Sequence, residues 1–251
     1  MENYLLNLGK KAKNLSTSII DSNKKNQVLK DYCKLILKNK HKIITENKKD
    51  LSNATYKGLK ENLLQRLLIN EKKIFEIINS LKAIIKFKDP VDRTLAKWIR
   101  PNGLKIKKKT IPIGVVSVIY ESRPNVTSDV ASLCFKSGNP VILKGGSEAY
   151  FSNKILTNLF KKALLKNNVS KDFVQFVDTK DRKSVDFLLL KMSDYIDVII
   201  PRGGKGLVKK VKDLSKVPII GHLEGVCHTY IDQYADLNMS KKITLNAKLR
   251  N

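Results

Sequence analysis

Apolar residues in the first 88 positions recur at three- and four-residue steps, with Lys, Asn and Glu between them. This spacing places them on one face of an α-helix, so we expect amphipathic helices that pack on other parts of the chain. The clearest series is Leu63, Leu64, Leu67, Leu68, Ile74, Ile77, Ile78, Leu81 and Ile84. We assign these side chains to the core and no function to this region.

After residue 110 the pattern changes to short apolar runs rich in β-branched residues, separated by amphipathic segments. Apolar runs without polar alternation are typical of strands that are covered on both faces in a parallel sheet. We expect strands at residues 114–120, 141–143, 173–177, 195–200, 217–220 and 227–231, and helices at 126–137, 150–166, 184–192, 207–214 and 234–249. The alternation predicts an α/β fold with a Rossmann-like parallel sheet.

Between the two regions, residues 94–109 read as two strand-like arms around the Pro-Asn-Gly sequence at 101–103. Asn-Gly favours a tight turn, which predicts a β-hairpin. Lysines dominate the second arm. From the residues alone we favour a solvated edge ribbon whose lysines prevent edge-to-edge pairing with other chains. The expected organisation is therefore an N-terminal helical part (1–88), a hairpin arm (89–110) and a Rossmann-like region (111–251).

The predicted strand at 114–120 ends in the polar loop Glu-Ser-Arg-Pro-Asn at 121–125. Pro124 cannot donate to a strand ladder and biases Arg123 away from helix, whereas Asn125 suits an N-cap. Asn125 is therefore expected where a strand ends and a helix begins.

Two glycine-rich turns follow later strands. Lys144 precedes Gly145-Gly146-Ser147, with a helix expected from about Glu148, and the segment 201–206 (Pro-Arg-Gly-Gly-Lys-Gly) opens the helix at 207. Free N–H groups at such helix starts can receive phosphate or ribose oxygens. The spacing at 201–206 is not GxGxxG, and turns of this kind also favour Gly and Ser for structural reasons, so both interpretations stay open. We expect all three turns to gather along one edge of the sheet.

The segment 221–225 contains two titratable residues, His222 and Glu224. Either side chain could handle protons, and a structural role is equally open. Cys227 and His228 look like a nucleophile and its base. We reject this pairing because adjacent residues on the expected strand point to opposite faces.

The chain has 251 residues and a formal net charge of +26, which suggests an anionic partner such as nucleic acid. Only seven of its 49 basic residues are Arg, and the lysines are spread over every segment without interleaved aromatic residues. This distribution argues against specific nucleic-acid binding, although a basic nucleic-acid-binding protein is kept as the least favoured alternative. Two of the arginines, Arg123 and Arg202, lie within the turns described above.

The three cysteines are an odd number without CxxC spacing, so neither a disulfide framework nor a zinc site is implied. No metal is expected, and a reducing cytoplasm fits. No uncharged apolar run approaches the ~18–20 residues of a membrane span, and the N-terminus lacks the apolar core of a signal peptide. The sequence thus predicts a cytoplasmic protein without membrane contact.

Four segments resemble successive signatures of one family: YESRPNVTSDVASLC, VILKGGSE, DVIIPRGGKGLV and HLEGVCHTYID. The family is γ-glutamyl phosphate reductase, a proline-biosynthesis enzyme of the aldehyde dehydrogenase superfamily. The resemblance implies the aldehyde dehydrogenase type of Rossmann-like sheet, N-terminal helices, and a hairpin at the subunit interface of a homo-oligomer. It also implies reduction of L-glutamate 5-phosphate to L-glutamate 5-semialdehyde with NADPH. Nothing but the resemblance distinguishes NADPH from NADH.

The resemblance further implies roles for residues in the three turns and in the segment at 221–225. Asn125 matches the asparagine whose amide stabilises the acyl oxygen, and Lys144 matches the lysine that binds the adenosine ribose. Glu148 follows Lys144 by four residues where many dehydrogenases have three, and it is left out. The implied cofactor-binding set is Tyr120, Glu121, Ser122, Arg123, Pro124, Lys144, Gly145, Gly146, Ser147, Arg202, Gly203, Gly204 and Glu224.

In the family the nucleophilic cysteine follows an Asn-Ala-Lys motif, which stands here at residues 246–248, close to Asn251. We therefore expect the nucleophile and the catalytic domain to be absent and the chain to be inactive alone, as the product of a truncated or split gene. A second hypothesis is a cofactor-binding subunit that pairs with a separate chain carrying the catalytic domain.

Overall fold

A computed structural model describes residues 1–121, 123–221 and 227–249 of the chain. The chain divides into two compact units, Met1–Gly221 and His222–Asn251, which are described separately. Within the described ranges, none of the helices combines the length and the apolar composition of a membrane span.

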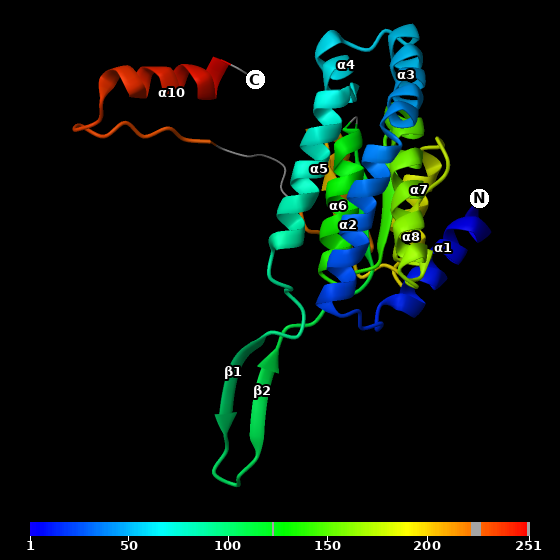
Figure 1. The fold of residues 1–251 in the computed structure, drawn as a ribbon, viewed down its shortest axis with the longest axis vertical. Coiled ribbons are helices and arrows are strands. Elements are labelled where there is room, and N and C mark those ends of the chain that lie inside the picture. The colour runs from blue at the N-terminus through cyan, green and yellow to red at the C-terminus, as the bar shows by residue number, and fades with distance from the viewer. Residues whose placement is uncertain (122, 222–226, 250–251) are drawn as a thin grey trace. The chain divides into compact units, whose positions relative to one another are not determined.

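The first unit is built around a four-stranded sheet in the order β5-β4-β3-β6. Helices lie in front of this sheet in the view of Figure 1. The strands are β3 (Val116–Tyr120), β4 (Val141–Gly145), β5 (Val174–Phe176) and β6 (Val198–Arg202), and every pairing is parallel. Helices α6 (Pro124–Lys136), α7 (Tyr150–Lys166), α8 (Lys183–Lys191) and α9 (Lys205–Leu214) alternate with them. The predicted α/β fold with a Rossmann-like parallel sheet is thus confirmed.

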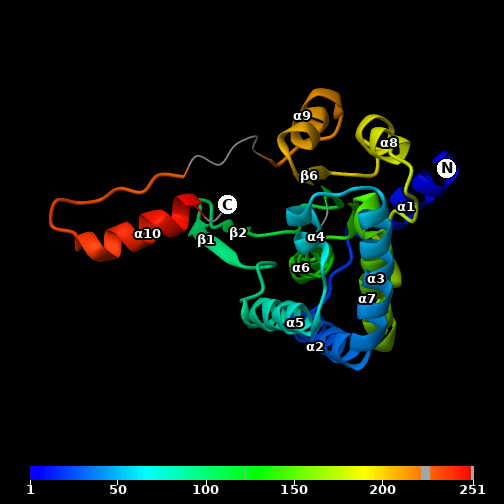
Figure 2. The same cartoon turned by 90° about the horizontal axis from the view of Figure 1, so that it is seen from above.

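Helices cover both faces of this sheet, as the view in Figure 2 shows. Val116, Val118 and Tyr120 of β3 join the core that the sheet shares with α2, α6 and α7, whereas Val115 and Ile119 join the core shared with α1, α8 and α9. Successive side chains of a strand point to opposite faces, so a strand between two helical layers must be apolar on both. This is why the strands read as uninterrupted apolar runs.

The N-terminal region forms the predicted amphipathic helices. They are α1 (Glu2–Leu15), α2 (Ser22–Lys38), α3 (Lys40–Tyr56), α4 (Glu61–Leu67) and α5 (Glu71–Lys86). The apolar face of α5 is buried through Ile74, Ile77, Ile78, Leu81 and Ile84, which are the residues of the predicted stripe. Asn70 caps this helix, because its side chain accepts a hydrogen bond from the Lys73 N–H at 2.9 Å.

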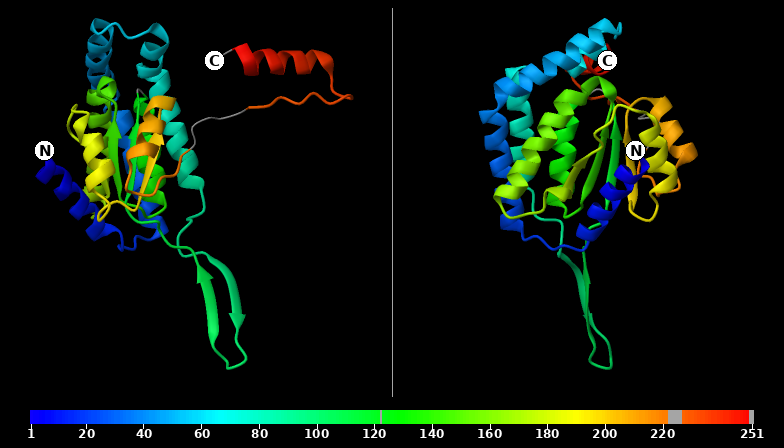
Figure 3. Two further views of the ribbon diagram at one scale, coloured as in Figure 1. Left: turned by 180° about the vertical axis from the view of Figure 1, so that it is seen from behind. Right: turned by 90° about the vertical axis from the view of Figure 1, so that its right-hand side faces the viewer.

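The hairpin is also present, as strands β1 (Thr94–Ile99) and β2 (Lys105–Lys109), which pair antiparallel. It extends away from the helices and the sheet of its unit (Figure 3). All six residues of β1 are exposed, among them Leu95, Trp98 and Ile99. Residues 94–109 therefore form a ribbon that the first unit does not cover.

Three predictions of local structure are wrong. Residues 217–220 form no strand and make one isolated bridge, Ile199 to Ile219, where the neighbouring Pro218 has no N–H to extend a ladder. Residues 227–231 form no strand either: they are exposed, and none of the strands that the structure describes pairs with them. The argument from strand geometry against a Cys227–His228 pair therefore loses its premise.

Asn125 is not an N-cap. Helix α6 starts at Pro124, and Arg123 occupies the N-cap position with extended backbone angles. Proline favours the first helical position because its fixed φ suits the helix and its missing N–H would have no helical partner there. Asn125 consequently lies inside the first turn of α6.

The second unit contains α10 (Leu237–Leu249). Asp236 accepts a hydrogen bond from the Met239 N–H at 2.6 Å, which stabilises the start of this helix. Lys248, within the Asn-Ala-Lys motif, donates from Nζ to the Cys227 carbonyl at 3.0 Å. None of the residues of α10 is buried.

Candidate functional site

The three predicted turns meet at the carboxyl edge of the sheet. Tyr120, the last residue of β3, is in register with Gly145 of β4 on one side and with Arg202 of β6 on the other. Parallel strands in register end together, so the turns that follow them lie side by side. The prediction that these turns gather along one sheet edge is confirmed.

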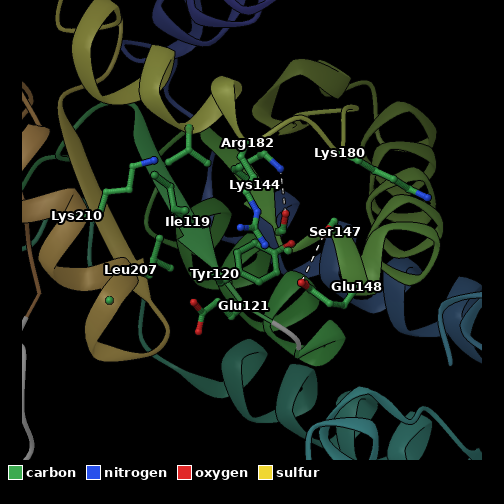
Figure 4. A pocket seen from close by; sticks show the side chains of 14 residues that line it. Ile119, Tyr120, Glu121, Lys144, Ser147, Glu148, Lys180, Arg182, Leu207 and Lys210 are labelled. Carbon is green, nitrogen blue, oxygen red and sulfur yellow. Dashed lines mark hydrogen bonds between the residues drawn. The ribbon is translucent and has the colours of Figure 1, made fainter. Parts of the chain in front are cut away.

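A pocket of about 300 Å³ opens at this edge (Figure 4). It is called the edge pocket below. Its lining residues are Ile119, Tyr120, Glu121, Lys144, Gly145, Gly146, Ser147, Glu148, Lys180, Arg182, Val185, Gly206, Leu207 and Lys210. Of the predicted cofactor-binding residues, Tyr120, Glu121, Lys144, Gly145, Gly146 and Ser147 thus line one cavity.

Lys144 is the buried cation of the edge pocket. Its side chain is held at the end of β4, where Nζ donates to the carbonyls of Gly145 and Thr179, each at 3.2 Å. Burial lowers the pKa of this ammonium group below its ordinary value, while the nearby Glu148 opposes that shift. Lys144 has donors that a ribose hydroxyl could engage, because an ammonium group carries three protons.

Gly145 is required by close packing behind the pocket. A Cβ atom at this position would lie 2.2 Å from Nδ2 of Asn153 on α7. The same part of α7 is tied to β3, since the Tyr120 hydroxyl is 2.7 Å from Thr127 Oγ1, which in turn donates to Asn153 Oδ1 at 2.8 Å. Burial raises the pKa of Tyr120, so its hydroxyl stays neutral and acts as a hydrogen-bonding group in the wall of the pocket.

The turn before α9 already holds a negative group. Glu121 Oε2 accepts a hydrogen bond from the Gly204 N–H at 2.7 Å, at the N-terminus of the ten-residue helix α9. A Cβ atom at Gly203 would lie 2.6 Å from the same oxygen, so a side chain here would displace the Glu121 carboxylate from this position. A carboxylate is stabilised at a helix N-terminus by the helix dipole and the free N–H groups. The chain's own carboxylate therefore occupies a position that also suits an anionic ligand.

Three cations of the edge pocket were not predicted: Lys180, Arg182 and Lys210. Lys180 lies over the rings of Tyr150 and Phe151, at 4.9 and 4.7 Å from their centroids, and Lys210 pairs with Asp186 at 2.6 Å. Arg182 makes no side-chain hydrogen bond or ion pair with any residue that the structure describes. Lys180 and Arg182 stand in the loop after β5, and the rule that parallel strands end at one edge could have identified them.

Asn125 lies in a different pocket, together with Arg123 and Pro124. Its amide donates from Nδ2 to Asp129 Oδ2 at 3.3 Å, and the other oxygen of Asp129 accepts from Ser80 Oγ at 2.8 Å. Burial raises the pKa of the Asp129 carboxyl group above its ordinary value. This chain of contacts from α5 to α6 orients the amide of Asn125.

The remaining predicted site residues divide into two groups. Arg202, Gly203 and Gly204 adjoin the edge pocket through Glu121 and do not line it. Ser122, His222 and Glu224 lie outside the described residues. Among the described residues, no three His, Cys, Asp or Glu side chains gather as metal ligands.

Neither of the two cysteines of the first unit, Cys33 and Cys134, lines the edge pocket. Cys33 and Cys134 are buried, and Cys227 is exposed. Burial raises the pKa of the Cys134 thiol to about 12, and it raises that of Cys33 as well. Because the thiolate is the nucleophile, both buried cysteines are structural residues.

The sequence is similar to curated γ-glutamyl phosphate reductases. It is 44% identical over 250 residues to the enzyme of Clostridium tetani. The aligned region covers 99% of this chain and 58% of that relative. No protein-family model matches the sequence. The chain thus spans less than two thirds of the length of the curated relatives it matches, and it is homologous to them over nearly its own whole length.

Solved structures give the same result. The crystal structure of γ-glutamyl phosphate reductase from Thermotoga maritima superposes with a TM-score of 0.90 at 35% identity, over 98% of this chain and 60% of that one. A more distant neighbour is glyceraldehyde-3-phosphate dehydrogenase GapN from Methanocaldococcus jannaschii complexed with NADP, with a TM-score of 0.66 and 15% identity. It covers 90% of this chain and 47% of the neighbour, and this likeness shows the fold alone.

Proposed function

Because the chain is homologous to γ-glutamyl phosphate reductase over nearly its whole length, we propose that it supplies the nucleotide-binding part of such an enzyme. The complete reaction would be the reduction of L-glutamate 5-phosphate to L-glutamate 5-semialdehyde and phosphate, with NADPH as reductant. The observation that carries the proposal is the convergence of three strand-end turns on the edge pocket, with Lys144 buried at its wall.

The residues of the edge pocket fit a dinucleotide. Lys144 would bind ribose hydroxyls, and the N–H groups around Gly145, Gly146 and Ser147 would donate hydrogen bonds to further oxygens of the nucleotide. The nicotinamide, when bound, supplies the hydride of the reduction.

Glu121 is the residue that must yield to the cofactor. Its carboxylate accepts a hydrogen bond from the Gly204 N–H at 2.7 Å, and a bound pyrophosphate would need the same donor. Two anions repel each other at one helix terminus, so we infer that Glu121 swings away when the dinucleotide binds. Arg202, the residue before Gly203, supplies a positive charge next to this turn.

The cations of the loop after β5 favour NADPH over NADH. Arg182 lines the edge pocket without a partner among the described residues, and Lys180 lies two residues before it. A guanidinium group binds a phosphate with two parallel hydrogen bonds, and an Arg close to the ribose commonly accommodates the 2′-phosphate of NADP. We assign Arg182 to this phosphate.

Asn125 would act on the substrate. Its amide is oriented by Asp129 and retains a second N–H, which could stabilise negative charge on the acyl oxygen. One such donor typically contributes about 3–4 kcal/mol to the stabilisation of a transition state. The sequence-based role of Asn125 thus stands as a proposal, although its position in α6 differs from the one predicted.

The wider organisation also remains proposed. The division into residues 1–88, 89–110 and 111–251, a homo-oligomer or a complementing chain, and a cytoplasmic location all extend from the resemblance and the unpaired cysteines. The exposed apolar residues Leu95, Trp98 and Ile99 of β1 support a role of the hairpin in contacts between chains.

The first test is direct dinucleotide binding to this chain, measured by isothermal titration calorimetry with NADP⁺ and NAD⁺. We expect NADP⁺ to bind about tenfold more tightly, because the 2′-phosphate gains a charge-assisted pair with Arg182. In R182Q this preference should fall to near unity while NAD⁺ binds as in the unmodified chain.

R100Q is the matched control, since Arg100 is an exposed arginine next to β1 that lines neither pocket. It should keep the full preference for NADP⁺. If neither dinucleotide binds the unmodified chain, the proposed nucleotide-binding role is wrong. If R182Q and R100Q lose the preference equally, Arg182 does not read the 2′-phosphate.

A further inference from the structure

A second cavity, separate from the edge pocket, lies where the N-terminus of α6 meets α4 and α5. Its volume is about 250 Å³. It is lined by Gln65, Arg66, Leu68, Ile69, Lys73, Ile77, Arg123, Pro124 and Asn125, and it is called the helix pocket below. The helix pocket contains Asn125 and none of the residues that line the edge pocket.

The polar side chains of the helix pocket are cationic or neutral. Arg66, Lys73 and Arg123 contribute three positive charges, and none of the described residues that line it is a carboxylate. Lys73 forms an ion pair with Glu76 on the same helix, at 2.7 Å. Arg66 and Arg123 make no side-chain hydrogen bond or ion pair with any described residue, so both guanidinium groups are available to a ligand.

The use of arginine at this place is selective. The chain has 42 lysines and only seven arginines among its 49 basic residues, yet two of the seven line this one small cavity. Arginine presents a planar fork of donors that matches a phosphate or carboxylate, whereas lysine is a compact point charge. Two forks on separate elements, one on α4 and one at the N-cap of α6, can hold one oxyanion from two sides.

Apolar residues complete the helix pocket. Ile69, Ile77 and Pro124 are buried and form part of its wall. Such a wall lowers the local dielectric and strengthens the attraction between a guanidinium group and an anion. The two guanidinium groups themselves are exposed, so an anion can reach them from solvent.

We propose that Arg66 and Arg123 form an oxyanion site beside Asn125, which binds the phosphoryl group of the substrate. The identity of the substrate rests on the proposed function, whereas the binding of phosphate by these two residues does not. Inorganic phosphate, the product that carries the same group, is accordingly a ligand of this site.

The phosphoryl group is favoured over the distal carboxylate for a geometric reason. In an acyl phosphate, phosphorus is one bridging oxygen away from the acyl carbon, so a donor to the acyl oxygen lies near the phosphoryl oxygens as well. The α-carboxylate of a glutamyl group is separated from the acyl carbon by three further carbon atoms. A pocket that contains both Asn125 and two arginines therefore fits the near anion. A phosphoryl group can also carry two negative charges, which two guanidinium groups balance.

The test is a titration of the full chain with inorganic phosphate, followed by isothermal titration calorimetry. R66Q and R123Q remove one guanidinium group each, and R100Q is the matched control outside both pockets. Arg66 and Arg123 are exposed, so these variants should fold, and thermal melting without phosphate checks that they do. We expect R66Q and R123Q to bind phosphate about fivefold more weakly, and R100Q to bind as the unmodified chain does.

Competition experiments separate the two anionic groups of the substrate. L-Glutamate carries the carboxylates without phosphorus, and it should compete poorly with phosphate. Stronger competition by L-glutamate that also requires Arg66 and Arg123 would assign the site to a carboxylate and overturn the proposal. Failure of the unmodified chain to bind phosphate saturably, or equal affinity in R66Q and R100Q, would overturn it as well.

R66Q also separates this proposal from the preceding one. Arg66 does not line the edge pocket, so NADP⁺ affinity should be unchanged in this variant. Loss of NADP⁺ binding in all chains would count against the nucleotide-binding role and leave the phosphate result intact.

Discussion

The parallel sheet and the hairpin show how differently strands of one chain are used. All five residues of β3 are buried, whereas all six residues of β1 are exposed. The sheet strands alternate with helices that cover both faces of the sheet. The two hairpin strands are joined directly, extend away from their unit and are not covered by it. The burial of a strand in this protein thus depends on the elements that flank it along the chain.

This difference has a functional side. Rigid strands that end together place Tyr120, Lys144 and Arg202 at one edge with their relative positions fixed. The hairpin positions none of the residues that line the edge pocket or the helix pocket and instead exposes apolar side chains. We therefore expect substitutions in the sheet region to act on folding and ligand binding, and substitutions in the hairpin to act on contacts with other chains.

The largest effect is expected from truncation of Phe160 on α7. Its ring is fully buried between Tyr32 and Phe135, with centroid distances of 4.6 and 5.8 Å. F160A would leave a cavity under the sheet and lower the free energy of unfolding by about 3–5 kcal/mol. Urea unfolding followed by far-ultraviolet circular dichroism measures this loss.

The conservative variant F160L tests whether the cavity is the cause. Leucine fills part of the space, so its cost should be less than half that of F160A. Equal losses in the two variants would show that the aromatic contacts, rather than the volume, stabilise this core. A loss in F160A below about 1 kcal/mol would contradict the close packing seen around α7.

A smaller effect concerns pH and the buried carboxylate of Asp31 on α2. It accepts hydrogen bonds from Lys166 at 2.8 Å, from Asn167 at 3.1 Å and from Gln27 at 3.2 Å. These contacts, chiefly the one from Lys166, lower the pKa of Asp31 to about 2. The folded-state pKa is depressed, so the stabilisation is present above the ordinary value near 4 and is lost as the pH falls toward 2.

Chemical denaturation between pH 5 and pH 2 isolates this contribution. In D31N the corresponding loss of about 1 kcal/mol on acidification should be missing, a modest value because Lys166 itself is mostly exposed. D92N is the matched control in the hairpin, where the pair between Asp92 and Lys109 is solvated on both sides. It should follow the unmodified chain. Identical acid profiles for D31N and D92N would show that burial does not strengthen the Asp31 network.

The sheet and the helices could be predicted from the sequence because their signals are periodic. Apolar runs marked β3 and β4, and three- and four-residue steps marked α5, since each element must bury a particular face. The segment at 227–231 shows the limit of this reasoning. Its residues have strand propensity, but no neighbouring strand pairs with them, and pairing cannot be read from a local pattern.

The site was predictable where it depends on strand ends and not where it depends on loops and helix packing. Lys144 and Gly145 are the last two residues of β4, and the apolar run before them predicts their place at the sheet edge. Arg182 follows the three-residue strand β5 after a loop of several residues. The rule that parallel strands end at one edge places this loop near the pocket, but no motif marks which of its residues lines the pocket. Arg66 reaches its pocket through the packing of α4 near α6, which is long-range in sequence. Neither position has a local signature.

The smallest effect on stability is expected for Trp98, the only tryptophan of the chain. It lies on β1 opposite Ile106 and is 44% exposed, so W98A should change the free energy of unfolding by less than about 0.5 kcal/mol. Because F160A removes a comparable ring from the core, the pair of variants measures the contrast between the sheet region and the hairpin directly. Trp98 fluorescence adds an independent measurement, because the emission should be that of a solvated indole at low protein concentration. An emission that shifts to shorter wavelength as the concentration rises would show that a second chain covers the hairpin, and W98A should then weaken that association. A loss above 1 kcal/mol in dilute W98A would instead contradict the exposed position of the hairpin.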